Sequence, residues 1–113
     1  MNQKNEYQQR PFNAEQLIRQ IGIGNFYAIS GGRVKAITNE QGETVEVILP
    51  VGKGYLVAIT LGWDDTYIVR RVYGWKKPRT KGVQSNVYCE EVGEIAYKAS
   101  CFVNVPFGEE VKT

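Results

Sequence analysis

Residues 55–73 read YLVAITLGWDDTYIVRRVY, and this segment gives the clearest indication of the fold class. Along 55–61, the side chains at 55, 57, 59 and 61, which are larger on average, alternate with those at 56, 58 and 60, and strand-forming residues dominate 66–73. Both patterns indicate β-strands, in which side chains repeat with a period of two. The link between them, residues 62–66, is short and rich in turn formers. We therefore expect the two strands to be antiparallel hairpin partners.

The sequence on both sides of this hairpin is also typical of strands. Further strands are predicted near Phe26–Ser30, Arg33–Ile37, Thr44–Leu49 and Arg79–Gln84, the first two as separate strands or as one strand bent at Gly31-Gly32. Pro78 lacks the amide hydrogen that a central strand needs, so residues 74–78 are predicted to form a protruding loop. The whole predicts a single antiparallel sheet of about five or six strands.

Helical patterns flank this sheet. Asn13 is placed to cap a short N-terminal helix that ends at Gly22. A longer helix is predicted from about Asn86 to Ser100, where apolar residues recur at spacings of three and four. Gly93 inside it predicts a close approach to a neighbouring strand, since glycine costs a helix roughly 1 kcal/mol. The predicted class is α+β, with both helices packed on the sheet.

Length and composition indicate one globular domain. The chain has 113 residues, 42% of them hydrophobic, and a net charge of +2. We expect a flexible leader at 1–11, a single domain at 12–105 and a flexible tail at 106–113. The first residues are polar and no apolar run is long enough to cross a membrane, so the predicted location is the cytoplasm, without membrane contact.

The two cysteines are predicted to be free thiols. Cys89 and Cys101 both fall in the predicted C-terminal helix, where a rise of about 1.5 Å per residue separates them by ~18 Å. A disulfide requires Cα atoms ~4.4–6.8 Å apart. We expect two small buried side chains in a reducing compartment.

The chain contains no histidine. This excludes Ser-His and Cys-His nucleophiles, imidazole acids and bases, and the common metal sites that use histidine. Neighbouring carboxylates at 64–65, 90–91 and 109–110 point in different directions in a strand or helix and form no automatic acid and base pair. We expect a binding protein and not an enzyme, with no cofactor and no metal.

Positive charge is concentrated between residues 70 and 81. This segment has six basic residues and no acidic one, so the rest of the chain nets −4. Basic side chains interleaved with aromatic rings are suited to phosphate contact and base stacking. The predicted ligand-binding residues are Arg70, Arg71, Tyr73, Trp75, Lys76, Lys77, Arg79 and Lys81, with Arg33 and Lys53 from two glycine-rich turns.

A purely structural interpretation of this charge stays open. Lysine and arginine on a sheet edge discourage pairing with another chain. Arg70 and Arg71 are also consecutive, so in a strand they point to opposite sides of the sheet. One of them then becomes a candidate for an internal ion pair.

The order of several segments resembles small uncharacterised α+β accessory proteins of bacteriophages and mobile elements. These segments are AISGGRV (28–34), LPVGKGY (49–55), DTYIVRRVY (65–73) and KGVQSNVYCEEVGEIAYKASCF (81–102). The resemblance brings no catalytic residue. It implies an anti-defence protein, similar in role to anti-CRISPR inhibitors, that acts by occupancy.

Three functions are therefore predicted as alternatives. The first is a phage-type counter-defence factor that captures an anionic nucleotide signal or blocks a nucleic-acid-handling host defence protein. The second is a direct DNA- or RNA-binding module. The third is a structural or assembly protein whose sheet edge forms a homo-oligomer.

Overall fold

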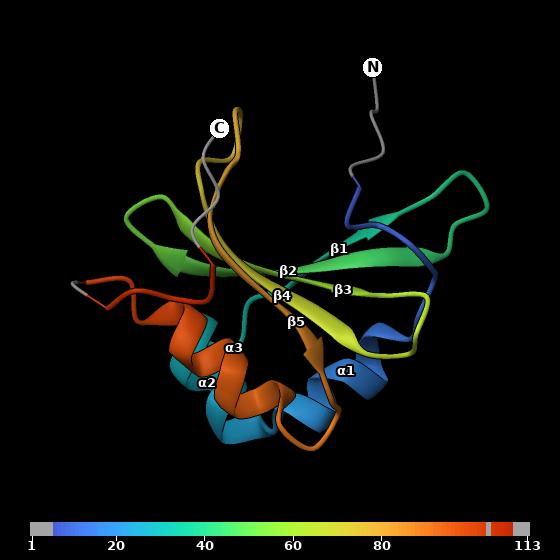
Figure 1. Ribbon diagram of the computed structural model, residues 1–113, viewed down its shortest axis with the longest axis horizontal. Coiled ribbons are helices and arrows are strands. Elements are labelled where there is room, and N and C mark those ends of the chain that lie inside the picture. The colour runs from blue at the N-terminus through green and yellow to red at the C-terminus, as the bar shows by residue number, and fades with distance from the viewer. Residues whose placement is uncertain (1–5, 104, 110–113) are drawn as a thin grey trace.

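The computed structural model describes residues 6–103 and 105–109 (Figure 1). Its elements are α1 (Ala14–Ile21), α2 (Ile23–Ser30), β1 (Lys35–Thr38), β2 (Thr44–Gly52), β3 (Tyr55–Leu61), β4 (Tyr67–Tyr73), β5 (Arg79–Val87) and α3 (Val92–Ser100). The strands form one sheet in the order β1-β2-β3-β4-β5, with every neighbouring pair antiparallel. The predicted α+β class and the single antiparallel sheet are confirmed.

The central hairpin is the predicted one. Its ladder runs without a register shift from Tyr55 opposite Tyr73 to Leu61 opposite Tyr67. In the turn, the Gly62 amide donates to the Thr66 carbonyl at 2.8 Å. Alternating apolar side chains and a short turn were thus sufficient to predict both strands.

The three helices lie on one face of the sheet (Figure 1). The core fills the space between helices and sheet, and its fully buried side chains include Leu17, Val47, Leu49, Val57, Ile59, Val69 and Val92. The other face of the sheet carries a smaller cluster of Leu56, Ala58 and Val72, with Ile48 packed against it. We call this second face the open face.

Residues 26–30 form a helix, so the prediction of a strand there was wrong. Helix α2 buries Phe26, Ile29 and Ser30, at the separations of three and four residues that place side chains on one helical face. Gly31 ends the helix with φ +65°. A short apolar run does not by itself distinguish a helix from a strand, and packing in the core decides the outcome here.

The C-terminal helix is shorter than predicted. Strand β5 continues to Val87 and α3 begins only at Val92, so Cys89 lies in the exposed link between them. Cys101 follows the end of α3 and is partly exposed. Both cysteines are free, as predicted, but the shared helix and the burial proposed for them were wrong.

Gly93 lies at a close contact, although with a helix and not with a strand. A Cβ atom at this position would lie 2.3 Å from the Ile21 carbonyl oxygen at the end of α1. Asn13 caps α1 as predicted, since its side chain accepts from the Gln16 amide at 2.8 Å. The contact at Gly93 and the cap fix where α1 ends and begins.

The predicted domain ends at residues 12 and 105, but residues outside these limits also contact the sheet. Arg10 forms a bridge with Leu61, and Glu109 forms one with Val83 on β5. Phe107 is 5% exposed and belongs to the core. Residues 1–5 and 110–113, which complete the predicted leader and tail, lie outside the described residues. Within residues 6–103 and 105–109, no helix is long and apolar enough to cross a membrane.

Candidate functional site

The meander gathers basic side chains at one end of the sheet. The β2–β3 turn with Lys53 and the β4–β5 loop lie there, because successive strands are antiparallel. Lys35 starts β1 opposite Ile48, in the middle of β2, and its side chain reaches Trp75 of the loop. The Gly74 amide donates to the Gly54 carbonyl at 2.8 Å and joins the turn to the loop. We call this the basic end, and it comprises the exposed residues Lys35, Lys53, Lys76, Lys77, Arg79 and Lys81.

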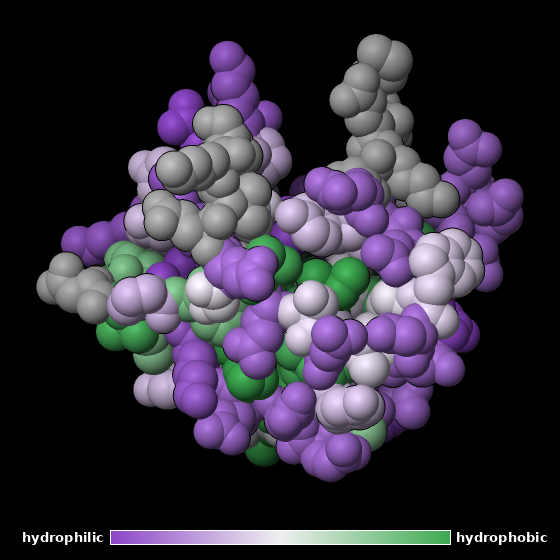
Figure 2. All heavy atoms as spheres, in the orientation of Figure 1, coloured by the Kyte–Doolittle hydropathy of each residue, from purple (hydrophilic) through white to green (hydrophobic). Residues whose placement is uncertain are grey.

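Within the described residues, no cation of the basic end forms an ion pair with a carboxylate. The ion pairs of the described residues involve cations outside the basic end, namely Arg10, Arg19, Arg70 and Lys98. Hydrophilic side chains cover the β4–β5 loop at the upper left of Figure 2. The opposite end of the sheet holds the acidic residues Glu40, Glu43, Asp64, Asp65, Glu90 and Glu91 in its turns and links. Charge is therefore segregated along the strands.

Two aromatic rings are exposed beside these cations. Trp75 is 49% exposed and Tyr73 is 44% exposed. The Nζ atom of Lys35 lies 5.6 Å from the centre of the Trp75 ring, so the β4–β5 loop reaches towards the edge strand β1. Tyr73 packs edge-on against Tyr55, with ring centres 5.0 Å apart. The basic end thus presents flat apolar surfaces among its charges.

Arg70 does not contribute to this surface. It is 7% exposed, and its guanidinium forms an ion pair with Glu46 on the open face. Its Nη1 atom also donates to the Thr80 hydroxyl at 2.9 Å, and the Tyr7 ring lies 4.4 Å from the guanidinium carbon. The internal ion pair left open by the sequence is therefore present at Arg70.

Arg71 is buried on the opposite face, where it holds the end of α3. Its Nε atom donates to the Ala99 carbonyl at 2.7 Å, and Nη2 donates to Lys98 at 3.1 Å and Cys101 at 2.9 Å. Its Nη1 atom donates to the Val105 carbonyl. Burial lowers the pKa of Arg71 from its ordinary value. Both arginines are thus engaged by the protein itself.

Of the ten predicted ligand-binding residues, eight remain exposed. Tyr73, Trp75, Lys76, Lys77, Arg79, Lys81 and Lys53 lie at the basic end. Arg33 lies in the α2–β1 link, where its Nε donates to the Ser30 carbonyl at 3.1 Å. Lys35 was missed by the sequence analysis, although its place at the start of a strand is a usable signal once the meander is known.

A hollow of ≈ 280 Å³ lies on the open face beside the basic end. Ile48, Leu56, Ala58 and Val72 supply its apolar surface, and the lining also includes Tyr7, Glu46, Arg70, Gly74, Trp75, Pro78 and Thr80. Trp75 therefore belongs both to this hollow and to the basic end. Sequence reasoning missed the hollow because its residues come from four strands, a loop and the N-terminal segment.

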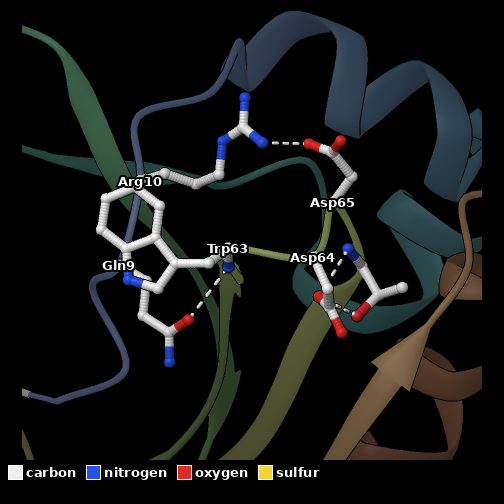
Figure 3. Close-up of polar contacts among 6 residues, drawn as sticks. Gln9, Arg10, Trp63, Asp64 and Asp65 are labelled. Atoms are coloured by element: carbon white, nitrogen blue, oxygen red, sulfur yellow. Dashed lines mark hydrogen bonds and ion pairs between the residues drawn. The ribbon is translucent and has the colours of Figure 1, made fainter.

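A second hollow, of ≈ 500 Å³, lies at the acidic end beside Trp63 and Asp64. Figure 3 shows how the N-terminal segment is attached there: Arg10 pairs with Asp65, and the Gln9 side chain accepts from the Trp63 amide at 3.0 Å. Asp64 accepts from the Thr66 amide and hydroxyl, which lowers its pKa. These carboxylates are thus used in building the turn.

Comparison with protein-family models, with curated proteins and with solved structures returned no match. Among residues 6–103 and 105–109, no group of three or more cysteine, aspartate or glutamate side chains is arranged to hold a metal ion.

Proposed function

We propose that the protein binds single-stranded nucleic acid at the basic end and holds it without transforming it. The observation that carries this proposal is the exposure of six cations, with no carboxylate partner in the described residues, beside the rings of Tyr73 and Trp75. Phosphate groups would supply the negatively charged partners of these cations, and release of the strand's counterions favours binding.

The aromatic rings favour a single strand over a duplex. Bases in a single strand are unstacked and present their flat faces to protein side chains, and such stacking tolerates any sequence. Tyr73 lies at the end of β4 against Tyr55, and Trp75 lies in the following loop beside Lys35 and directly before Lys76 and Lys77.

Protection of the sheet edges explains only part of the charge. Arg79 and Lys81 lie on the edge strand β5, and Lys35 lies on the other edge strand, β1. Charges at these positions discourage edge-to-edge pairing. Lys53, Lys76 and Lys77 lie in turns and protect no edge, so edge protection does not account for the cluster as a whole.

The counter-defence role predicted from the sequence stays a proposal, in the form that this surface supports. A protein that sequesters a phosphate-bearing ligand acts by occupancy and requires no catalytic residue. Mononucleotides and cyclic nucleotides carry the same chemistry as a strand, with fewer phosphates. Competition between them and a labelled strand distinguishes nucleotide capture from nucleic-acid binding.

Fluorescence anisotropy with a labelled single-stranded oligonucleotide at low salt tests the proposal. The double variant Lys76→Gln/Lys77→Gln is expected to lower affinity by about tenfold or more, since it removes two phosphate contacts. The matched control, Arg19→Gln/Lys98→Gln, makes the same change in net charge at exposed helix positions. The control is expected to change affinity by about twofold or less. Equal losses in both variants, or no binding by the original protein, would contradict the proposal.

A further inference from the structure

We infer that the hollow on the open face is a base pocket, which takes one flat heteroaromatic ring of the strand held at the basic end. The inference rests on the proposed function and adds where a base enters the protein. The volume of the hollow, ≈ 280 Å³, is just below the ~300–1,000 Å³ of typical small-molecule sites. A hollow of this size suits one ring system and not a whole nucleotide chain.

Electrostatics assign a base to the hollow and phosphates to its rim. Arg70 and Glu46 both line the hollow, and they pair with each other, so the charge within it is balanced. The cations of the basic end stand outside, on the loop, the turn and the edge strands. A neutral ring is favoured in the balanced hollow, while a phosphate is favoured at the positive rim.

The lining of the hollow is already suited to a flat ring. The Tyr7 ring lies 4.4 Å from the Arg70 guanidinium carbon, and the Trp75 ring also borders the hollow. Apolar side chains such as Leu56 and Val72 complete the lining. Nucleobases bind proteins through the same combination of aromatic rings and apolar surface.

A buried donor in the lining lacks a partner. The Arg70 side chain is 9% exposed, and its Nε atom has no hydrogen-bond partner among the described residues. Buried polar groups are nearly always satisfied, and Arg70 borders the hollow, so a base with an acceptor that reaches Nε would satisfy this donor. The carbonyl oxygens and ring nitrogens of a base are acceptors of this kind.

Trp75 connects the hollow to the basic end. It lines the hollow, precedes Lys76 and Lys77 in the loop, and lies 5.6 Å from the Lys35 ammonium. A strand whose phosphates contact these lysines therefore passes the mouth of the hollow. One base turning inwards would stack on Trp75 while its neighbours stay outside.

The test compares two oligomers of equal length and charge, oligothymidine and its abasic counterpart, by anisotropy at low salt. The original protein is expected to bind oligothymidine about tenfold more tightly, within the range that stacking of one base provides. Ile48→Phe, which fills the hollow with a bulky aromatic side chain, is expected to remove this preference and leave binding of the abasic oligomer unchanged. Trp75→Leu is expected to reduce the preference as well, since Trp75 belongs both to the hollow and to the basic end.

Matched controls are available at the other end and edge of the sheet. Trp63→Leu removes an exposed ring near the acidic end, and Ala36→Phe adds a ring on the exposed surface of β1. Both are expected to keep the tenfold preference. Should Ile48→Phe fail to fold, as judged by its melting temperature, Ile48→Met, a smaller change at the same position in the hollow, provides the comparison.

The outcomes separate this inference from the proposed function. A folded Ile48→Phe variant that keeps the preference for oligothymidine would overturn the base pocket and leave binding at the basic end intact. Failure of the original protein to bind either oligomer would overturn the proposed function. Concentration-dependent dimerisation that Ile48→Phe abolishes would assign the hollow to a second copy of the chain and overturn the inference.

Discussion

Arg70 and Arg71 are neighbours in β4, and their guanidinium groups are buried on opposite faces of the sheet. Arg70 pairs with Glu46 on the open face, whereas Arg71 donates to backbone carbonyls at the end of α3. These two adjacent arginines of the basic segment are thus structural. The surface available to a ligand begins beyond them, in the β4–β5 loop and its neighbours.

Replacing Arg71 with leucine is expected to lower the free energy of unfolding by about 3 kcal/mol, because four carbonyl groups, buried or partly buried, lose a charged donor. Urea denaturation measures the change. Arg79→Leu, at an exposed position on β5, is the control and is expected to stay within about 0.5 kcal/mol of the original protein. A loss for Arg71→Leu as small as the one expected for Arg79→Leu would mean that the Arg71 contacts contribute little to stability.

Glu46→Gln is expected to lower the free energy of unfolding by about 3–5 kcal/mol, because it leaves the Arg70 charge buried without its partner. The double variant Glu46→Leu/Arg70→Met is expected to recover most of this loss, since it removes both charges. Thermal and urea unfolding of the single and double variants complete the cycle. A double variant less stable than Glu46→Gln would contradict the assignment of the loss to an unpaired charge.

Gly93→Ala and Gly24→Ala are expected to have opposite effects on stability. A Cβ atom at Gly93 would lie 2.3 Å from the Ile21 carbonyl oxygen, so α3 has to move away from α1. A Cβ atom at Gly24 in α2 meets nothing within 4 Å, and alanine favours helix by up to about 1 kcal/mol. Melting temperatures are expected to fall for Gly93→Ala and to rise for Gly24→Ala. A rise for both would mean that the helices are not in close contact.

The contribution of Asp64 to stability is expected to depend on pH. Its hydrogen bonds from Thr66 lower its pKa below the ordinary value of 3.8. Because the folded state favours the charged form, this stabilisation is present above pH 3.8 and is lost as the pH falls through the lowered pKa. The difference in melting temperature between the original protein and Asp64→Asn is therefore expected at pH 7 and to shrink below pH 3.8. A melting-temperature difference that does not change with pH would contradict this role of the Asp64 charge.

Local patterns predicted the parts of the fold whose contacts are local. The hairpin of β3 and β4 joins alternating strands by a short turn, and the Asn13 cap acts within one helical turn. Helix α2 was mistaken for a strand because its short apolar run is compatible with either structure until its packing is known. The length of α3 was overestimated because the apolar spacing continues into the link with Cys89.

The candidate site was predictable only in part, for a related physical reason. The excess of basic residues between 70 and 81 is a property of the sequence, and it located Trp75, Lys76 and Lys77 correctly on one loop. The burial of Arg70 depends on Glu46, which lies on β2 and reaches it across β3. The order of strands in the sheet decides such contacts, as it also decides that Lys35 joins the basic end.

The most direct test of the central claim is the dependence of single-strand affinity on salt concentration. A strand held by the basic end is expected to lose affinity log-linearly with salt, with a slope of about −0.7 for each phosphate contact. Lys76→Gln/Lys77→Gln is expected to reduce the steepness of that slope by about 1.4, whereas Arg19→Gln/Lys98→Gln leaves it unchanged. A slope near zero, or one that the loss of Lys76 and Lys77 does not change, would contradict the account.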